Sequence, residues 1–149
     1  MSFGSFWSGI KMYVSSSIYI YYLSDHFCAR SQEIDSNGKP KGSLTALATR
    51  PSNVGGAVEA AKIFKYGSYY YLFTSWDKCC SGTSSTYSIR VGRSSAVTGP
   101  YKDKAGVALT AGGGTLVLGK QGVIIGPGGQ DVFQDADGPI LVYRASHSS

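Results

Sequence analysis

The chain has 149 residues, the length of one ordinary domain with enough residues to bury a core. Its formal charge is +5, from 14 Lys and Arg against 9 Asp and Glu, and the basic residues are scattered through the chain. Nucleic-acid binding is disfavoured, because proteins that track phosphates gather their cations in runs or patches. No run of about 18 apolar residues occurs, so no transmembrane segment is predicted.

The composition predicts an all-β protein with many tight turns. Gly and Tyr are abundant, at 20 and 11 residues, and no long segment has the 3.6-residue period of a helix. The predicted strands lie at residues 18–23, 44–48, 63–64, 69–74, 87–91, 115–118, 123–125, 132–133 and 140–143. Turn-type residues separate them, at 36–40, 66–67, 111–114 and 135–138. Short strands recurring about four to a unit are typical of a β-propeller blade.

The most informative stretch runs from residue 58 to residue 101. Tyr87, Ile89 and Val91 alternate with small or polar residues, which predicts a strand with one buried face. Glu59 is a lone carboxylate among small and apolar residues at the entry to an earlier strand. A carboxylate in that setting is unlike a solvated surface charge. It is either paired with a partner, or its pKa is raised and used in chemistry.

The three cysteines are Cys28, Cys79 and Cys80, an odd number with two adjacent. This is neither a disulfide framework nor the spacing of a zinc site. Two alternatives stay open for the adjacent pair. One is a strained vicinal disulfide in a rigid loop, and the other is two free thiols in a tight loop.

Several short segments form a recognisable set through their order and spacing. They lie at residues 2–10, 58–60, 69–73, 79–82, 91–94, 99–101, 112–115 and 126–128. Together they resemble glycoside hydrolase family 43, and within it the endo-1,5-α-L-arabinanases of filamentous fungi. The resemblance covers about residues 1–12 and 54–143, and residues 13–30 do not match.

The resemblance implies part of a five-bladed β-propeller. On this interpretation residues 1–149 are one incomplete propeller domain with about two to three of the middle blades. A piece of this size does not close the ring and leaves sheet edges exposed.

The resemblance also implies an inverting mechanism that uses three carboxylates. Glu59 matches the general acid through its Val-Glu-Ala context, with a hydrogen-bonded strand-end Glu as the structural alternative. Ser5, Phe6 and Trp7 match the segment that lines the sugar site, where aromatic rings give broad contact to sugar faces. The general base and the aspartate that tunes the acid match no residue of this chain.

No cofactor is expected. The family often holds a calcium ion in its central channel, near a His that follows Gly-Pro-Gly. Here that position is Gly129, whose side chain offers no ligand atom.

The implied function is hydrolysis of α-1,5-L-arabinan in plant cell-wall pectin, with this chain inactive alone because only the acid is identified. One alternative is a non-catalytic carbohydrate-binding fragment that keeps Trp7, Trp76 and the tyrosines, and another is a truncated gene-model product. The expected partners are arabinan or arabino-oligosaccharides, with a monomeric chain and neither membrane nor nucleic acid. The resemblance implies an extracellular location, although the chain has no convincing signal peptide.

Overall fold

The computed structural model describes residues 11–14, 17–25, 27–51 and 56–147, with side chains described from residue 27 onward. The first sheet contains β1 (Lys11–Val14), β2 (Ser17–Asp25), β3 (Cys28–Ile34) and β4 (Pro40–Thr49). The second contains β5 (Ala57–Tyr66), β6 (Tyr69–Asp77), β7 (Ser88–Ser94) and β8 (Thr115–Leu118). The third contains β9 (Ile124–Asp135) and β10 (Gly138–His147). Two 3-10 turns, η2 (Gly82–Ser84) and η3 (Leu109–Ala111), lie in the loops of the second sheet.

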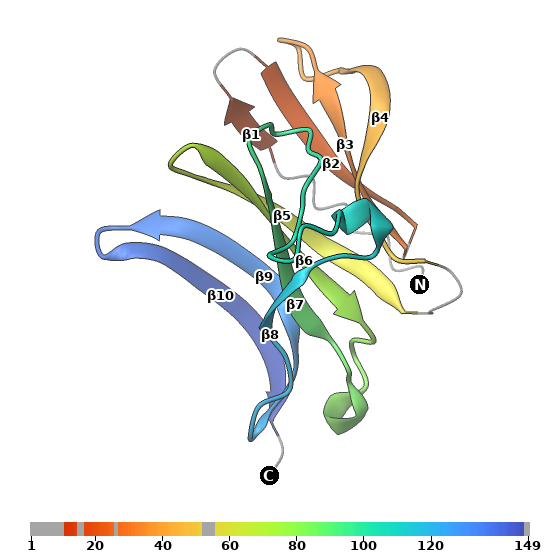
Figure 1. Ribbon diagram of the computed structural model, residues 1–149, viewed down its shortest axis with the longest axis vertical. Coiled ribbons are helices and arrows are strands. Elements are labelled where there is room, and N and C mark those ends of the chain that lie inside the picture. The colour runs from red at the N-terminus through yellow and green to blue at the C-terminus, as the bar shows by residue number, and fades with distance from the viewer. Residues whose placement is uncertain (1–10, 15–16, 26, 52–55, 148–149) are drawn as a thin grey trace, which may run out of the picture.

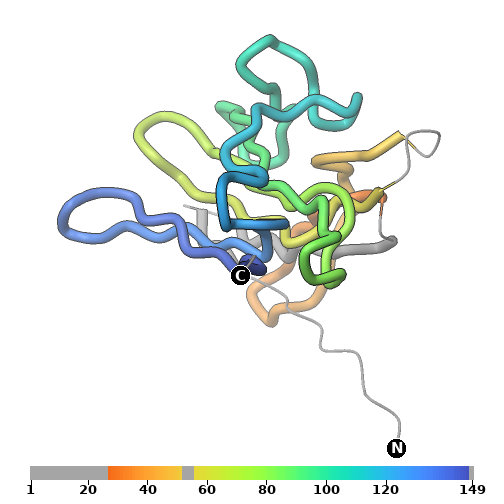
Figure 2. Tube along the Cα trace, turned by 90° about the horizontal axis from the view of Figure 1, so that it is seen from below, coloured from red at the N-terminus to blue at the C-terminus, as the bar shows by residue number. Residues whose placement is uncertain are grey.

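Within each sheet, every strand pairs antiparallel with the strand next to it in the sequence. The chain therefore folds as two four-stranded meanders followed by a hairpin, and the three sheets fan out in Figure 1. Figure 2 shows the hairpin of β9 and β10 extending beside the hairpin of β5 and β6, and β9 contacts β5. The all-β prediction is confirmed, with the chain forming two to three blades of a five-bladed propeller.

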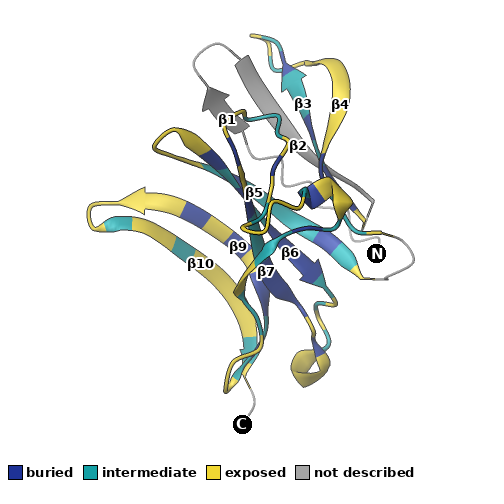
Figure 3. Ribbon diagram, in the orientation of Figure 1, coloured by how far each residue is buried: buried dark blue, intermediate teal, exposed yellow. Residues whose placement is uncertain are grey.

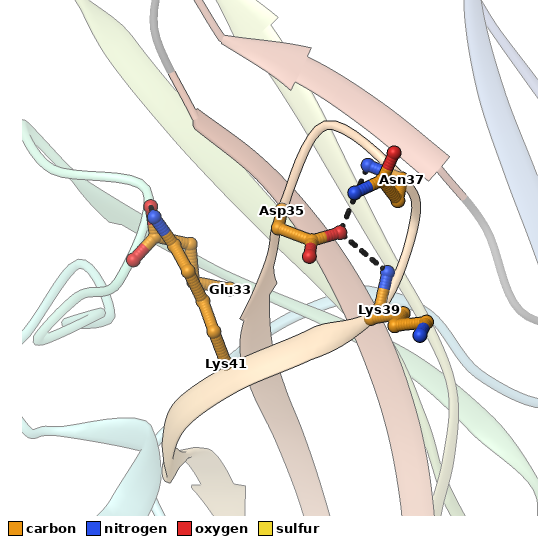
Figure 4. A network of polar contacts seen from close by, with 5 residues as sticks. All are labelled: Glu33, Asp35, Asn37, Lys39 and Lys41. Atoms are coloured by element: carbon orange, nitrogen blue, oxygen red, sulfur yellow. Dashed lines mark hydrogen bonds and ion pairs between the residues drawn. The ribbon is translucent and has the colours of Figure 1, made fainter.

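The turn between β3 and β4 shows how local sequence sets the strand register. Asp35 Oδ1 accepts hydrogen bonds from the backbone N–H groups of Asn37 at 2.9 Å and Lys39 at 2.8 Å (Figure 4). Gly38 takes a positive φ of 77°, a conformation that glycine adopts without steric cost. Lys41 and Glu33 then form an ion pair of 2.9 Å across the two strands. The turn predicted at residues 36–40 is confirmed.

The core lies where the first two sheets meet. Figure 3 shows its dark buried segments along β5, β6 and β7. Leu47 and Ala48 from β4 pack in one cluster with Val58, Leu72 and other buried residues of the second sheet. Burial of such apolar side chains contributes about 1.5–3 kcal/mol each to folding.

Trp76 on β6 belongs to this core and is only 1% exposed. The guanidinium carbons of Arg50 and Arg90 each lie 5.2 Å from its ring, and Arg50 also bonds Asp77 at 2.5 Å. The suggestion that Trp76 is a sugar-binding platform is therefore wrong, because a buried ring cannot contact a polysaccharide.

Two sequence predictions need correction in detail. The strand β7 exists, but Ser88 and Gly92 are buried as well as Ile89, while Val91 is half-exposed. Neighbouring parts of the fold cover both faces of β7, so the prediction of a single buried face was wrong. The segments 123–125 and 132–133 are not separate strands, because β9 runs unbroken from Ile124 to Asp135.

Candidate functional site

The candidate acid, Glu59, lies on β5 at the edge of a β-bulge. Glu59 pairs with Ser75 on β6, but the next paired residue is Lys62, opposite Phe73. Ala60, inside the bulge, has a positive φ of 49°, which is uncommon for a residue with a Cβ. Bulges of this kind bend a strand and redirect its side chains, and they often occur beside active sites.

The Glu59 carboxyl group is held by Tyr87, the residue just before β7. The Tyr87 hydroxyl donates a hydrogen bond of 2.7 Å to Glu59 Oε2. Burial raises the pKa of Tyr87 well above its usual range, and the bond to Glu59 raises it further. The phenol therefore stays protonated and remains a donor. Glu59 thus has a hydrogen-bond partner, as its sequence context required.

A polar chain from β9 supports the bulge from the next sheet. The Gly129 N–H donates to Ser75 Oγ at 2.9 Å, and that hydroxyl donates to Gln130 Oε1 at 2.5 Å. Gln130 Nε2 in turn donates to the carbonyl oxygen of Ala60 at 2.7 Å. Ser75 and Gln130 are buried, so these bonds strongly fix where β9 lies relative to Glu59.

Close packing of β9 onto Tyr87 completes the support. A Cβ added at Gly128 would lie 2.2 Å from Tyr87 Cδ1 and 3.0 Å from Ser75 Oγ. No side chain fits in that space, so only glycine lets the strand approach the ring. The Gly-Pro-Gly motif at 126–128 is therefore a backbone surface for the aromatic ring that binds Glu59.

The adjacent cysteines lie in the loop between β6 and β7, near the same carboxyl group. Both thiols are free. The pKa of Cys79 is raised to about 11, first by its hydrogen bond with Cys80, then by burial and by electrostatic interaction with Cys80 and Glu59. Cys79 is therefore a neutral thiol at neutral pH.

Two aspartates on the strands around Glu59 are neutralised by cations. Asp131 on β9 bonds Lys62 at 2.5 Å, and Asp77 at the end of β6 bonds Arg50. That neither aspartate takes the role of the missing base or of the tuning aspartate stays a prediction.

The residues around Gly129 do not fit a calcium ion. Gly129 has a φ of 59°, and its missing Cβ would lie 3.6 Å from the Arg144 Nε atom, which belongs to a cation. Calcium instead requires several oxygen ligands. Across the described residues, no three His, Cys, Asp or Glu side chains gather closely enough to hold a metal ion. That the protein uses no cofactor stays a prediction.

The remaining predicted site residues, Ser5, Phe6 and Trp7, lie outside the described residues. The sequence prediction missed Tyr87 as the partner of Glu59, and it missed the Ser75–Gln130 pair. The sequence did carry a signal for Tyr87, because Tyr87 begins the alternating pattern of residues 87–91. Ser75 and Gln130 are 55 positions apart and carry no mutual signal in the sequence.

Comparison with known proteins identifies the family of enzymes to which this chain belongs. The family model "Glycosyl hydrolases family 43" matches residues 4–149, so the chain belongs to that family. The matched range includes residues 13–30, where the motifs showed no resemblance. Within the described residues, no helix is long and apolar enough to cross a membrane.

The relatives include bacterial and fungal arabinanases. The chain is 44% identical over 146 residues to extracellular endo-α-(1→5)-L-arabinanase 1 of Bacillus subtilis, covering 97% of this chain and 38% of that protein. It is 41% identical over 151 residues to the probable arabinan endo-1,5-α-L-arabinosidase A of Neosartorya fischeri, covering 97% of this chain and 41% of the relative.

Among solved structures, α-L-arabinanase from Cellvibrio cellulosa in complex with arabinohexaose matches with a TM-score of 0.85 and 28% identity, covering 94% of this chain and 48% of that one. An exo-1,5-α-L-arabinanase from a bovine ruminal metagenomic library matches with a TM-score of 0.86 and 30% identity, covering 93% and 47%. This chain therefore spans less than half the length of these relatives.

Proposed function

We propose that this chain carries the general-acid side of the active site of an inverting α-1,5-L-arabinan hydrolase, with Glu59 as the proton donor. The observation that carries the proposal is the position of Glu59. Its carboxyl group is held by Tyr87 beside a bulge, on a chain of glycosyl hydrolases family 43. The names of the relatives, which are arabinanases, supply the substrate class.

In the proposed reaction, protonated Glu59 gives its proton to the oxygen that leaves as the glycosidic bond breaks. A base on the opposite face of the sugar activates water, and the two carboxyl groups of an inverting enzyme stand about 6.5–9.5 Å apart to admit that water. The hydrogen bond from Tyr87 fixes Glu59 Oε2 and so orients the carboxyl group. The base is not identified among the residues of this chain.

Ser5, Phe6 and Trp7 are proposed to contact the sugar. Arabinose rings present C–H faces, and a Trp ring gives a rigid apolar surface for them. The substrate is a cell-wall polysaccharide, and a relative is named extracellular, so we also propose that the protein acts outside the cell as a monomer.

The substrate class is tested by affinity electrophoresis of the chain in gels that contain debranched arabinan or xylan. We expect arabinan to retard the chain and xylan to leave its mobility unchanged. Trp7→Ala should abolish the retardation. Phe133→Ala, which removes an exposed ring on β9, should keep it. Equal retardation by both polysaccharides, or none by either, would contradict the proposed substrate, and retention by Trp7→Ala would remove Trp7 from the site.

A further inference from the structure

The loop between β6 and β7 holds two adjacent free thiols in an ordered frame. Its neck is closed by two hydrogen bonds between Lys78 and Thr86, from Thr86 N to Lys78 O at 2.9 Å and from Lys78 N to Thr86 Oγ1 at 3.2 Å. Cys80 is exposed and has a positive φ of 61°, while Cys79 is half-buried. Both thiols therefore lie within a closed loop and not on a loose chain segment.

Further contacts fix the inside of this loop. Ser81 N donates to Ser85 Oγ at 3.0 Å, and Ser81 Oγ donates to the Cys79 carbonyl oxygen at 3.3 Å. The strand β9 packs against the loop from outside, because a Cβ at Gly126 would lie only 2.5 Å from Ser85 Cβ. The two cysteines are therefore held next to each other by structure as well as by sequence.

We propose that Cys79 and Cys80 form a redox-active dithiol that peroxide converts into a vicinal disulfide. In the first step the Cys80 thiolate attacks hydrogen peroxide, which gives a Cys80 sulfenic acid and, after protonation, one water. In the second step the Cys79 sulfur attacks the Cys80 sulfur, the S–S bond closes an eight-membered ring, and a second water leaves. The two thiols lose two protons and two electrons, and one peroxide is reduced to two waters.

The assignment of the two roles follows from their surroundings. Cys80 is the exposed thiol, so peroxide reaches it first. The main cause that raises the pKa of Cys79 is its hydrogen bond with Cys80. Cys79 is the neighbouring thiol in the same closed loop, so it is the sulfur placed to attack the sulfenic acid of Cys80.

Chain geometry predicts that this disulfide is easily reduced. Neighbouring Cα atoms are about 3.8 Å apart, closer than the roughly 4.4–6.8 Å found in ordinary disulfides. Strained disulfides have higher reduction potentials and belong to the labile or regulatory class. Ring closure therefore changes the shape of the loop.

The dithiol lies near the proposed acid Glu59, and the loop leads from its neck at Thr86 directly into Tyr87. The inference goes beyond the proposed function and does not depend on it. Its test uses thiol counting and mass measurement, which require no substrate.

The experiment labels the native chain with a maleimide before and after treatment with hydrogen peroxide, and measures intact mass. The reduced native chain should take two labels, because Cys28 is buried. After peroxide the mass should fall by two hydrogen atoms, and the native chain should take no label. Denaturation should then expose one thiol, that of Cys28. Dithiothreitol should restore both native labels.

The position of the bond is checked in the tryptic peptide 79–90, which should contain the disulfide within one peptide. Cys80→Ser is the matched control and should lose both the mass decrease and its reversal. Oxidation that only adds oxygen, a disulfide to Cys28, or a disulfide between two chains would each overturn the proposal. So would a Cys80→Ser variant that behaves like the natural chain.

Discussion

The Tyr87 hydroxyl donates a 2.7 Å hydrogen bond to Glu59 Oε2, and this bond joins β5 to the residue just before β7. Glu59 lies on β5 and Tyr87 precedes β7, so the bond passes over β6. A carboxyl group held by a buried donor has a defined orientation, which a proton donor in catalysis requires. The bulge at Ala60 and the contact of Gly128 with Tyr87 both serve this arrangement.

The first prediction concerns Tyr87→Phe. Loss of the hydrogen bond to Glu59 should lower the free energy of unfolding by about 1–3 kcal/mol near neutral pH. The folded state raises the pKa of Tyr87 above its unfolded value of about 10. Its contribution is therefore full below pH of about 10 and is lost as pH rises above that value. Urea unfolding at pH values below and above about 10 should show that the difference in free energy of unfolding between the natural chain and the variant shrinks as pH rises.

The raised pKa of Cys79 has the same sign, and Cys79 also raises the pKa of Tyr87. Its effect does not cancel between the two proteins, so both are compared with Cys79 replaced by Ser. Tyr143→Phe, which changes an exposed tyrosine on β10, is the control and should leave the stability unchanged. A Tyr87→Phe chain as stable as the natural one at both pH values would show that the bond contributes nothing.

The second prediction concerns Gly128→Ala. The new methyl group would lie 2.2 Å from the Tyr87 ring, so β9 or the ring must move. We expect the free energy of unfolding to fall by about 1–3 kcal/mol, as overpacking usually costs. Gly119→Ala is the matched control, because its Cβ would meet Leu116 at an ordinary contact distance of 3.7 Å. Equal stability of the two variants in urea would refute the close contact.

The third prediction concerns the bulge. A residue with a Cβ in the left-handed region costs roughly 1–2 kcal/mol, which Ala60→Gly would relieve. Glycine also loses about 0.5–1 kcal/mol through the greater freedom of the unfolded chain. Ala60→Gly should therefore be neutral or stabilising, whereas Ala61→Gly should lower stability by about 0.5–1 kcal/mol. The test is thermal unfolding of both variants. An equal loss of stability in Ala60→Gly and Ala61→Gly would argue against strain at the bulge.

The strands and turns were predictable because their signals are local. Asn37-Gly38 and Tyr66-Gly67 mark turns by residue type alone. The first lies in a turn, and the second is one residue early, because Tyr66 ends β5 and the turn is formed by Gly67 and Ser68. Glu59 stood out because a charge among apolar neighbours needs a partner. The bulge left no such signal. The sequence predicted a strand only at residues 63–64, whereas β5 runs from Ala57 to Tyr66, and the extra residue appears only in the pairing with β6.

The polar support of the site was not predictable for a different reason. Ser75, Gln130 and the carbonyl oxygen of Ala60 meet only when β9 packs against β5 and β6. Trp76 was misinterpreted because an aromatic residue at a strand end can face either a sugar or the core. The two arginines that flank it come from positions 50 and 90, which sequence spacing does not connect.

The central claim is that Glu59 is the acid of an acid and base pair whose base this chain does not supply. General acid and general base each contribute typically 10²–10⁴-fold to rate. The most direct measurement is the release of reducing sugar from debranched arabinan by the natural chain and by Glu59→Gln. The account predicts no turnover by the natural chain above the level of the variant. Rapid turnover that Glu59→Gln abolishes would contradict it, and would show that an aspartate of this chain acts as the base.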